Sequence, residues 1–380
     1  MLFLTFLLIF LQAGYASYIF WLRKAWNSQP EYLPNKASAE KLSILIPARN
    51  EEHSIGNLLN DILLQSLPKE QFEVIVIDDA SSDSTAEKVS MFKATNPTIS
   101  LKYLRLEDEQ GLNIYKKRAI AAGIALAQND IIITTDADCR FSEDWLKTVA
   151  GYFEQHKPKM LLGAVKFDNK PKLFNTFQQL EFSALVAVTA ASAKLGHPLM
   201  CNGANLSYRK SAFDQVGGYG NERFASGDDM FLMYKIAKKF RGGVHFLKSQ
   251  KAMATTAAKQ DINEFLSQRK RWVSKNRFLP DWNTLLVGAL TYSATVSLII
   301  YFALLFCLPV SFGWQVFFVA FTLKFIADYS FIKSIAAFFS ISDKLKFVPL
   351  SFFLNLIYVS FILIFSAIGG QYYWKGRKVK

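Results

Sequence analysis

The stretch Ile131–Asp138, with the sequence Ile-Ile-Ile-Thr-Thr-Asp-Ala-Asp, sets the expectations for the fold and the site together. A continuous apolar run that ends abruptly in acids is typical of a buried strand in a parallel sheet. Open α/β sheets bind ligands at the carboxyl ends of their strands, where Asp136 and Asp138 would lie. Two carboxylates one residue apart can share a hard divalent cation whose other ligands are water and phosphate oxygens. A polar turn without a ligand is the competing interpretation.

Two earlier segments repeat the arrangement of an apolar strand followed by polar residues. Leu42–Pro47 leads into Ala48-Arg49-Asn50-Glu51, and Val74–Ile77 leads into Asp78-Asp79. Each is followed by a helical segment, so the alternation predicts a doubly wound α/β fold with a parallel sheet and right-handed crossovers. The carboxyl ends of parallel strands share one edge, so we expect these acids to gather in one crevice. Their mutual repulsion requires a cation or hydrogen-bond donors to offset it.

The first residues of the chain are expected to lie in a membrane. The chain has 380 residues and is 51% hydrophobic, and residues 1–22 are nearly all apolar and carry no charge. That length is sufficient for a transmembrane helix. Arg23 and Lys24 follow the apolar run, which favours a retained anchor with its C-terminal flank in the cytoplasm. A cleaved signal peptide is the alternative.

Apolar segments return near the C-terminus. Leu285–Val310 and Phe347–Tyr372 lack charged side chains and are predicted to span, whereas Lys324 and Asp328 interrupt Phe312–Phe331. This middle segment crosses, re-enters or lies in the interface, and four spans in total are favoured. The predicted order is an N-terminal transmembrane helix at 1–22, a linker at 23–40, the α/β domain at 41–250, an interfacial segment at 251–282, two or three transmembrane helices at 283–372 and a basic tail at 373–380.

Several classes of function are disfavoured by what the sequence lacks. There is no GxGxxG motif after the first strand and no GxxxxGK[ST] motif, which argues against dinucleotide and P-loop sites. The three cysteines form no CxxC pair and the four histidines form no cluster, so neither a zinc site nor a disulfide framework is indicated. The net charge of +13 is attributed to an anionic membrane surface and phosphate-bearing substrates. No nucleic-acid partner is expected, because no basic stripe with interleaved aromatic residues stands apart from the membrane segments.

Five segments in order resemble the family 2 glycosyltransferases of the GT-A fold, and the membrane-bound, synthase-like branch is the best match. They are Pro47–Glu51, Asp78-Asp79, Asp136-x-Asp138, Asp228-Asp229 and Gln268-x-x-Arg271-Trp272. The resemblance covers about Ser43 to Trp272. It implies a GT-A domain flanked by transmembrane helices, in a multi-pass protein of the inner membrane with a cytoplasmic catalytic domain. The implied activity is inverting transfer of a sugar from a nucleotide-diphosphate sugar, a UDP-sugar by preference, to a lipid-linked or glycan acceptor.

The resemblance also implies how the nucleotide is held. Asp79 would bind the uracil and ribose, with Asp78 and Glu51 as further candidates in a pocket that includes Pro47 and Asn50. For Asp78 the competing interpretation is a charge at a helix N-terminus that binds no ligand.

In this resemblance the diphosphate is assigned to the stretch Ile131–Asp138. Asp136 would contact the ribose, Asp136 and Asp138 would hold Mg²⁺ or Mn²⁺ against the diphosphate, and Ala137 lies between them. Lys116 occupies the place of a Gly-Lys pair in relatives, although Tyr115 stands here instead of the glycine. A solvated lysine on a helix is the alternative for Lys116.

The resemblance makes Asp229 the general base that removes the proton from the attacking acceptor hydroxyl, with Asp228 beside it. Asn202 and Gly203 belong to a small-residue segment under the sugar and acceptor, where a plain turn is the alternative. A pair of acids that simply favours a helix N-terminus is the alternative for Asp228 and Asp229.

The last motif is assigned to the leaving group and the acceptor. Gln268, Arg271 and Trp272 would share one helical turn, with Arg271 forking to the diphosphate and Trp272 stacking beneath the acceptor sugar. The alternative is an interfacial amphipathic helix, and both are compatible if the remaining basic residues face lipid phosphates. Those residues are Arg269, Lys270 and Lys275.

The sequence leaves three rival functions open. A processive polysaccharide synthase would use the same motifs. A nucleotidyltransferase would share the fold but would not need Gln268-x-x-Arg271-Trp272. An inactive nucleotide-binding or lipid-binding subunit is disfavoured because every motif keeps its acids.

Overall fold

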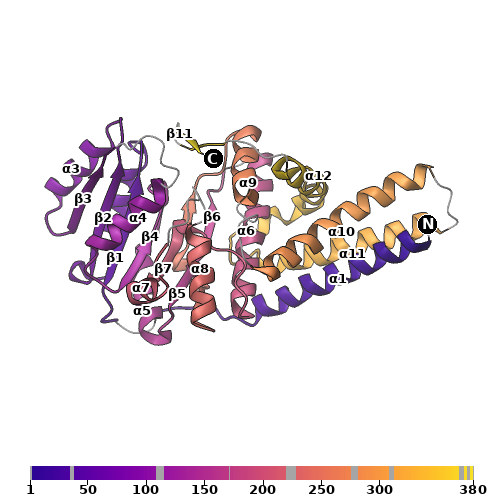
Figure 1. Ribbon diagram of the computed structural model, residues 1–380, viewed down its shortest axis with the longest axis horizontal. Coiled ribbons are helices and arrows are strands. Elements are labelled where there is room, and N and C mark those ends of the chain that lie inside the picture. The colour runs from indigo at the N-terminus through magenta and orange to yellow at the C-terminus, as the bar shows by residue number, and fades with distance from the viewer. Residues whose placement is uncertain are drawn as a thin grey trace. The chain divides into compact units, whose positions relative to one another are not determined.

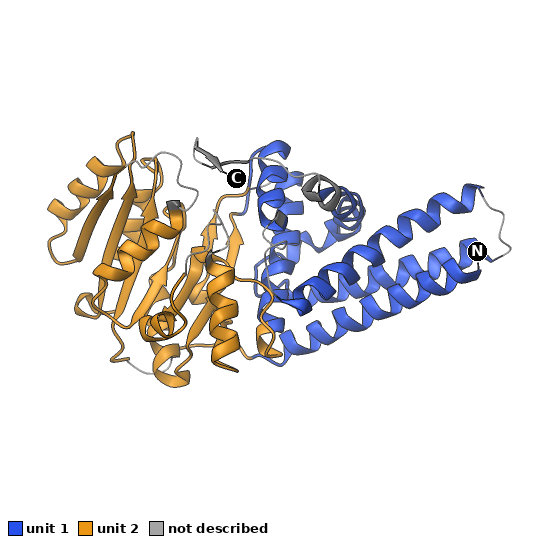
Figure 2. Ribbon diagram, in the orientation of Figure 1, with its two compact units in different colours: residues 1–29, 169–192, 259–370 blue, residues 30–168, 193–258, 371–380 orange. Residues whose placement is uncertain are grey.

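The structure, a computed structural model, describes residues 2–34, 38–107, 115–170, 172–219, 228–274, 281–307, 312–367, 372–374 and 377–379. At Tyr115, Asp228, Ser274 and beyond residue 362 only the backbone is described. The chain divides into two compact units, coloured separately in Figure 2. Unit 1 consists of Met1–Gln29, Asn169–Ser192 and Lys259–Gly370, and unit 2 consists of Pro30–Asp168, Ala193–Ala258 and Gln371–Lys380. The predicted α/β domain at 41–250 is therefore not continuous, because Asn169–Ser192 belongs to unit 1.

Unit 2 contains a seven-stranded sheet with the order β3-β2-β1-β4-β7-β5-β8. The predicted strands are confirmed: their apolar runs are almost entirely buried, as expected where helices cover both faces of a sheet. The first four strands, β1 (Leu42–Ala48), β2 (Phe72–Asp79), β3 (Ser100–Leu106) and β4 (Ile131–Thr134), are mutually parallel.

The second half of the sheet corrects the expectation of a wholly parallel arrangement. Strand β7 (Leu206–Arg209) runs antiparallel to β4 and to β5 (Met160–Gly163), while β8 (Val244–Leu247) is parallel to β5. The sheet is therefore mixed. Because β7 runs in the opposite direction, its amino-terminal end lies beside the carboxyl end of β4, where Thr134 pairs with Leu206.

Helices cover this sheet, and two short strands form a second one (Figure 1). Gly123 explains how closely one helix, α4, packs on the sheet, because a Cβ at this position would lie 2.8 Å from the Ile77 side chain. The helices are α2 (Ile55–Leu63), α3 (Thr85–Thr95), α4 (Tyr115–Leu126), α5 (Trp145–His156), α7 (Lys210–Gln215) and α8 (Asp228–Lys239). The short parallel strands are β6 (Val165–Phe167) and β9 (Ala254–Thr256).

Unit 1 is helical, and among the described residues four of its helical segments are long and apolar enough to cross a membrane. Three of them, α1, α10 and α11, run side by side (Figure 1). The helices of unit 1 are α1 (Leu2–Asn27), α6 (Leu173–Lys194, apart from its last two residues), α9 (Ile262–Ser274), α10 (Trp282–Cys307), α11 (Gly313–Ile335) and α12 (Val348–Ala367).

Two predicted boundaries are corrected. Helix α1 continues past Leu22 to Asn27, since Trp26 is buried and its indole N–H donates to the carbonyl of Ser334. The predicted linker therefore begins later than residue 23. At the other end, α12 is described to Ala367, and Tyr372 belongs to strand β10 (Tyr372–Trp374), which pairs with β11 (Arg377–Val379).

The charges that interrupted the third apolar segment are paired inside the helical unit. Lys324 Nζ lies 3.2 Å from Asp328 Oδ2 and 3.7 Å from the centre of the Tyr15 ring. The Tyr15 hydroxyl donates to Asp328 Oδ1 at 2.6 Å. Burying a charge in a membrane is tolerated when a partner neutralises it. The pairing removes the objection to α11 as a spanning helix.

Candidate functional site

The loops after β1 and β2 are joined at the carboxyl edge of the sheet. Ala48 pairs with Asp78 in the register, which brings the two strand ends together. The Asn50 side-chain oxygen accepts from the Ser82 amide at 2.9 Å, and the Glu51 amide donates to Thr85 Oγ1 at 2.8 Å. Asn50 has a φ of 51°, a left-handed conformation that asparagine tolerates better than most residues. Asn50 and Glu51 thus form a fixed turn after β1, and Pro47 lies within β1, where it pairs with Ile77 of β2.

The adjacent acids Asp78 and Asp79 have different surroundings. Asp78 is fully buried, and its two carboxylate oxygens accept from the Ser81 amide at 2.8 Å and the Tyr103 hydroxyl at 2.6 Å. These contacts hold the turn after β2. Asp79 lies with its Oδ1 3.7 Å from the guanidinium of Arg118, on helix α4. Both oxygens of Asp78 are therefore used within the protein, whereas Asp79 faces a cation from α4.

Helix α4 brings a second cation to the acids after β4. Lys116 forms an ion pair with Asp136, whose side chain is about 39% exposed. Asp138 is exposed, and its Oδ2 accepts from Thr256 Oγ1 at 3.3 Å. Ala137, between the two acids, is buried and so holds the turn against the protein. The predicted Lys116 is in this site, rather than being a solvated charge elsewhere on α4.

Gly203 joins these groups to the predicted base. Its amide donates to Asp229 Oδ2 at 3.0 Å, and its carbonyl accepts from Thr134 Oγ1 at 2.9 Å. A Cβ built on Gly203 would lie 3.5 Å from Asp229 Oδ2 and 3.7 Å from Lys116 Nζ. Residues far apart in the sequence therefore surround one space: Lys116 from α4, Gly203 from the turn before β7, and Asp229 from the start of α8.

The carboxylate of Asp229 has a fixed orientation. Its Oδ2 is held by the Gly203 amide and its Oδ1 accepts from the Met230 amide at 2.9 Å. The turn that carries Gly203 is itself fixed, since the Asn202 side chain accepts from the Ala204 amide. Asn202 is thus a capping residue. The side chain of Asp228, predicted to lie beside Asp229, falls outside the described residues.

The donor set at Asp136 and Asp138 fits a hard divalent cation with few protein ligands. Both side chains supply carboxylate oxygens, the ligands that Mg²⁺ and Mn²⁺ prefer. Among the described residues no group of three or more such side chains gathers, so water and phosphate oxygens would complete the coordination. Burial, and then the charges of these two aspartates, raise the pKa of the Cys139 thiol well above its usual range.

The residues of the last motif lie on α9 in unit 1. Trp272 is half-buried, with its ring centre 5.7 Å from that of Phe182 on α6. Arg269 was expected to face lipid phosphates, and this is wrong: it is 1% exposed and forms an ion pair with Glu181 on α6. Gln268 accepts from Arg269 Nη1 at 2.8 Å. Lys275 lies outside the described residues.

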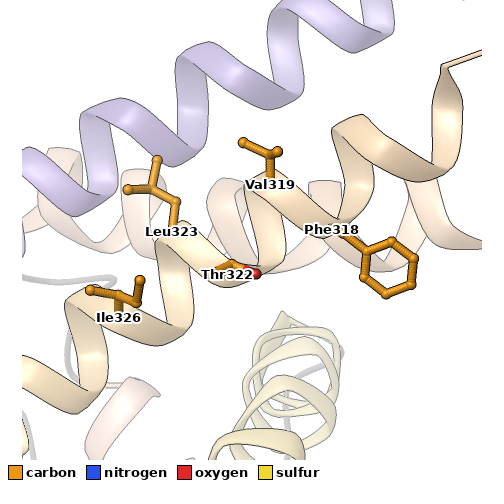
Figure 3. A pocket seen from close by; sticks show the side chains of 5 residues that line it. All are labelled: Phe318, Val319, Thr322, Leu323 and Ile326. Carbon is orange, nitrogen blue, oxygen red and sulfur yellow. The ribbon is translucent and has the colours of Figure 1, made fainter.

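An apolar groove on α11 is a separate feature of unit 1. Figure 3 shows its lining, formed by Phe318, Val319, Thr322, Leu323 and Ile326. It contains no ionisable side chain, so it cannot hold a nucleotide diphosphate. Its composition suits a membrane-spanning helix.

Comparison with known protein families identifies the family of this chain. Residues 131–367, more than half of the chain, match the family described as Glycosyl transferase family group 2, and residues 43–217 match Glycosyl transferase family 2. The chain is a family 2 glycosyltransferase. The matches cover the strands, the acids and the Gln268–Trp272 helix described above. They confirm the family that the motifs indicated.

Relatives of this glycosyltransferase are known at low identity. The chain is 26% identical over 254 residues to the poly-beta-1,6-N-acetyl-D-glucosamine synthase of Staphylococcus aureus (strain COL), covering 66% of this chain and 58% of the relative. The synthase of the same name from Staphylococcus epidermidis is 25% identical over 274 residues, covering 70% and 62%. The chain therefore matches less than two thirds of the length of these relatives.

A solved structure shares the fold of this glycosyltransferase. The mannosyltransferase PcManGT from Pyrobaculum calidifontis, in complex with GDP-Man and Mn²⁺, superimposes with a TM-score of 0.58 at 17% sequence identity. The superposition covers 96% of this chain and 98% of that one. At this identity the likeness establishes the GT-A fold alone.

Two basic residues of this glycosyltransferase were not assigned to the site from the sequence. Arg118 lies near Asp79. The sequence feature that could have indicated this is its position two residues after Lys116, at the start of the same helix. Arg269 lies inside the predicted motif, but nothing in the sequence links it to Glu181, which is 88 residues away.

Proposed function

We propose that this family 2 glycosyltransferase is a membrane-anchored, inverting enzyme that moves a sugar from a nucleotide-diphosphate sugar to a glycan or lipid-linked acceptor. The observation that carries the proposal is the convergence of Lys116, Gly203 and Asp229 around one space, with Asp136 paired to the same lysine. This arrangement places a candidate base beside a candidate diphosphate site. A protein that only bound a nucleotide would not need Asp229 to be held in a fixed orientation.

The proposed reaction uses each group once. The acceptor hydroxyl attacks the anomeric carbon from the face opposite the nucleotide, forming the new glycosidic bond as the bond to the phosphate oxygen breaks. Asp229 takes the proton of that hydroxyl. The electron pair leaves with the nucleoside diphosphate, whose charge Lys116 is positioned to stabilise. Attack from the opposite face inverts the anomeric configuration.

The proposed donor is a UDP-sugar, with UDP-N-acetylglucosamine as the first candidate. Relatives named as synthases of poly-N-acetylglucosamine support this sugar, because such a polymer requires an activated N-acetylglucosamine. Asp79, with Arg118 beside it, would bind the uridine, and Pro47 at the end of β1 with the turn of Asn50 and Glu51 would close the pocket. The mannosyltransferase with the same fold holds GDP-Man, so GDP-mannose is the competing donor.

We propose that Asp136 and Asp138 hold Mg²⁺ or Mn²⁺ when the donor is bound. Such a cation would neutralise the diphosphate and favour its departure. The residues of this chain would supply two carboxylates, and the ion pair between Lys116 and Asp136 would open so that Lys116 pairs with the diphosphate and Asp136 with the cation. The presence of Mn²⁺ with the related fold supports this proposal.

The proposed setting is the cytoplasmic face of the inner membrane. Helix α1 ends with Arg23 and Lys24 near its C-terminus, and the basic residues of an anchored helix favour the cytoplasmic side. Nucleotide-sugars are cytoplasmic metabolites. Catalysis at this face would let unit 2 meet both the donor and a membrane-bound acceptor.

A panel of labelled donors tests the proposed function. The purified full chain, in lipid nanodiscs with Mg²⁺ or Mn²⁺, would be given UDP-N-acetylglucosamine, UDP-glucose or GDP-mannose together with an oligosaccharide acceptor. We expect label transfer from a UDP-sugar, and the product length separates single addition from processive synthesis. Transfer from GDP-mannose alone would overturn the donor assignment, and no transfer from any donor would favour a binding subunit.

Metal removal gives a further prediction. Chelation with EDTA should abolish sugar transfer, because the diphosphate would lose its main counter-charge, and added Mg²⁺ or Mn²⁺ should restore it. The measurement is initial rate against free metal concentration, with Ca²⁺ as a comparison ion. Transfer that continues at the same rate in EDTA would contradict a metal at Asp136 and Asp138.

A further inference from the structure

Arg269 is a buried cation at the contact between α9 and α6 in unit 1. Its side chain is about 2% exposed and that of Glu181 about 10% exposed. Both ends of the guanidinium fork reach the Glu181 carboxylate: Nε donates to Oε1 at 3.1 Å, and Nη2 donates to Oε2. A bidentate pair of this kind fixes direction as well as distance.

The same guanidinium contacts two residues of the Gln268-x-x-Arg271-Trp272 motif. Its carbon lies over the Trp272 ring, 4.2 Å from the ring centre, and its Nη1 donates to Gln268 Oε1 at 2.8 Å. It also lies 4.6 Å from the centre of the Phe265 ring, one turn earlier on α9. Helix α6 contributes twice, because Phe182, next to Glu181, packs against Trp272.

We propose that Arg269 is a positioning residue for sugar transfer, held by Glu181, that sets the orientation of the Trp272 ring and the Gln268 amide toward the glycan acceptor. This rests on the proposed function. The guanidinium covers one face of the indole, so the half-buried ring keeps its remaining surface for a sugar. The Gln268 oxygen is used by Arg269, which leaves its amide group to donate to the acceptor.

A lysine cannot replace Arg269 in this arrangement. The guanidinium is planar and offers five N–H donors in a fixed fork, whereas an ammonium is a point charge that cannot stack flat on an indole. Arg269→Lys keeps the charge opposite Glu181 but loses the fork and the stacking. Glu181→Gln keeps the shape at the other end but removes the charge that holds the guanidinium. The pair of variants therefore separates charge from geometry.

A spectroscopic experiment reads the orientation of Trp272 without relying on activity. The full chain, whose seven tryptophans are replaced by 5-fluorotryptophan, would be studied by ¹⁹F NMR in nanodiscs, with Trp272→Phe assigning the signal of interest. We expect Arg269→Lys and Glu181→Gln each to shift and broaden the Trp272 signal. The control Lys270→Gln, which removes a charge from the neighbouring position, should leave it in place.

Kinetics of the same variants complete the test. With UDP-N-acetylglucosamine and an N-acetylglucosamine trisaccharide, we expect the KM for the trisaccharide to rise by about 10- to 100-fold, the range that small misplacements cause, while the donor KM stays constant. An unchanged Trp272 signal, or signals that move throughout the protein in both variants, would overturn the proposal. If the wild type transfers no sugar, the proposed function fails, and the NMR result still reports whether Arg269 positions Trp272.

Discussion

Asp78 and Asp79 are the last two residues of β2, and their surroundings distinguish them. The Tyr103 hydroxyl and the Ser81 amide use both oxygens of Asp78, and partial burial together with the hydrogen bond raises the pKa of Tyr103, which keeps its proton as the donor. Asp79 instead faces Arg118. The resemblance ranked Asp79 before Asp78, but the sequence could not supply the physical reason for their difference, because the residues that surround them come from β3 and α4.

The position of Gly203 beside Asp229 and Lys116 gives a testable prediction for a single residue. In Gly203→Ala the added methyl would be in ordinary contact with Asp229 and Lys116, so the fold should tolerate it. It would fill the space between the base and the diphosphate, and we expect kcat to fall by about 10- to 100-fold with a change in unfolding free energy of no more than about 1 kcal/mol. Sugar-transfer rates and thermal melting would be measured together.

The matched control is Gly56→Ala on α2, where a Cβ would meet no atom within 4 Å. This variant should keep full activity. Normal kcat in Gly203→Ala would show that the space around Gly203 is not used in the reaction.

Whole elements were predictable where the pattern was local. The apolar runs of β1, β2 and β4 and the helical spacing in α2 are read from adjacent residues, and the structure confirms them. Strand β7 was not predicted as antiparallel, because its direction depends on the path of the chain from β5 through α6. The end of α1 was missed for a similar reason, since Trp26 is buried against residues more than 300 positions away.

The Lys324–Asp328 ion pair of α11, which Tyr15 of α1 also contacts, leads to a prediction about the packing of these helices. Asp328→Asn would leave the buried Lys324 without a counter-charge, and breaking a buried pair in this way costs about 3–5 kcal/mol. We expect a lower melting temperature in detergent. The double variant Lys324→Met with Asp328→Leu should recover most of the loss, because it removes both charges.

Lys333→Met serves as the control, since it removes an exposed lysine from the same helix. This variant should have the same melting temperature as the wild type. If Asp328→Asn is as stable as the wild type, the Lys324–Asp328 pair does not stabilise the helical unit.

At the scale of the whole molecule, the sequence predicted the kinds of parts better than their boundaries. The α/β part and the apolar helices were identified from composition and periodicity, and the five ordered motifs indicated the family that the comparisons confirm. Asn169–Ser192 belongs to unit 1 although it lies between strands β6 and β7 of unit 2, and no local pattern in the sequence indicates this. Unit 1 and unit 2 are therefore interleaved along the chain.

We propose that Asp136 and Asp229 perform separate tasks, donor binding and proton removal. The measurement is UDP binding by calorimetry beside labelled sugar transfer, in Asp136→Asn, Asp229→Asn and the exposed control Asp214→Asn. We expect Asp229→Asn to lower sugar transfer by about 100-fold or more while UDP binding persists. Asp136→Asn should lose both UDP binding and sugar transfer, and Asp214→Asn should keep both. Full transfer by Asp229→Asn, or unimpaired UDP binding by Asp136→Asn, would contradict this proposal.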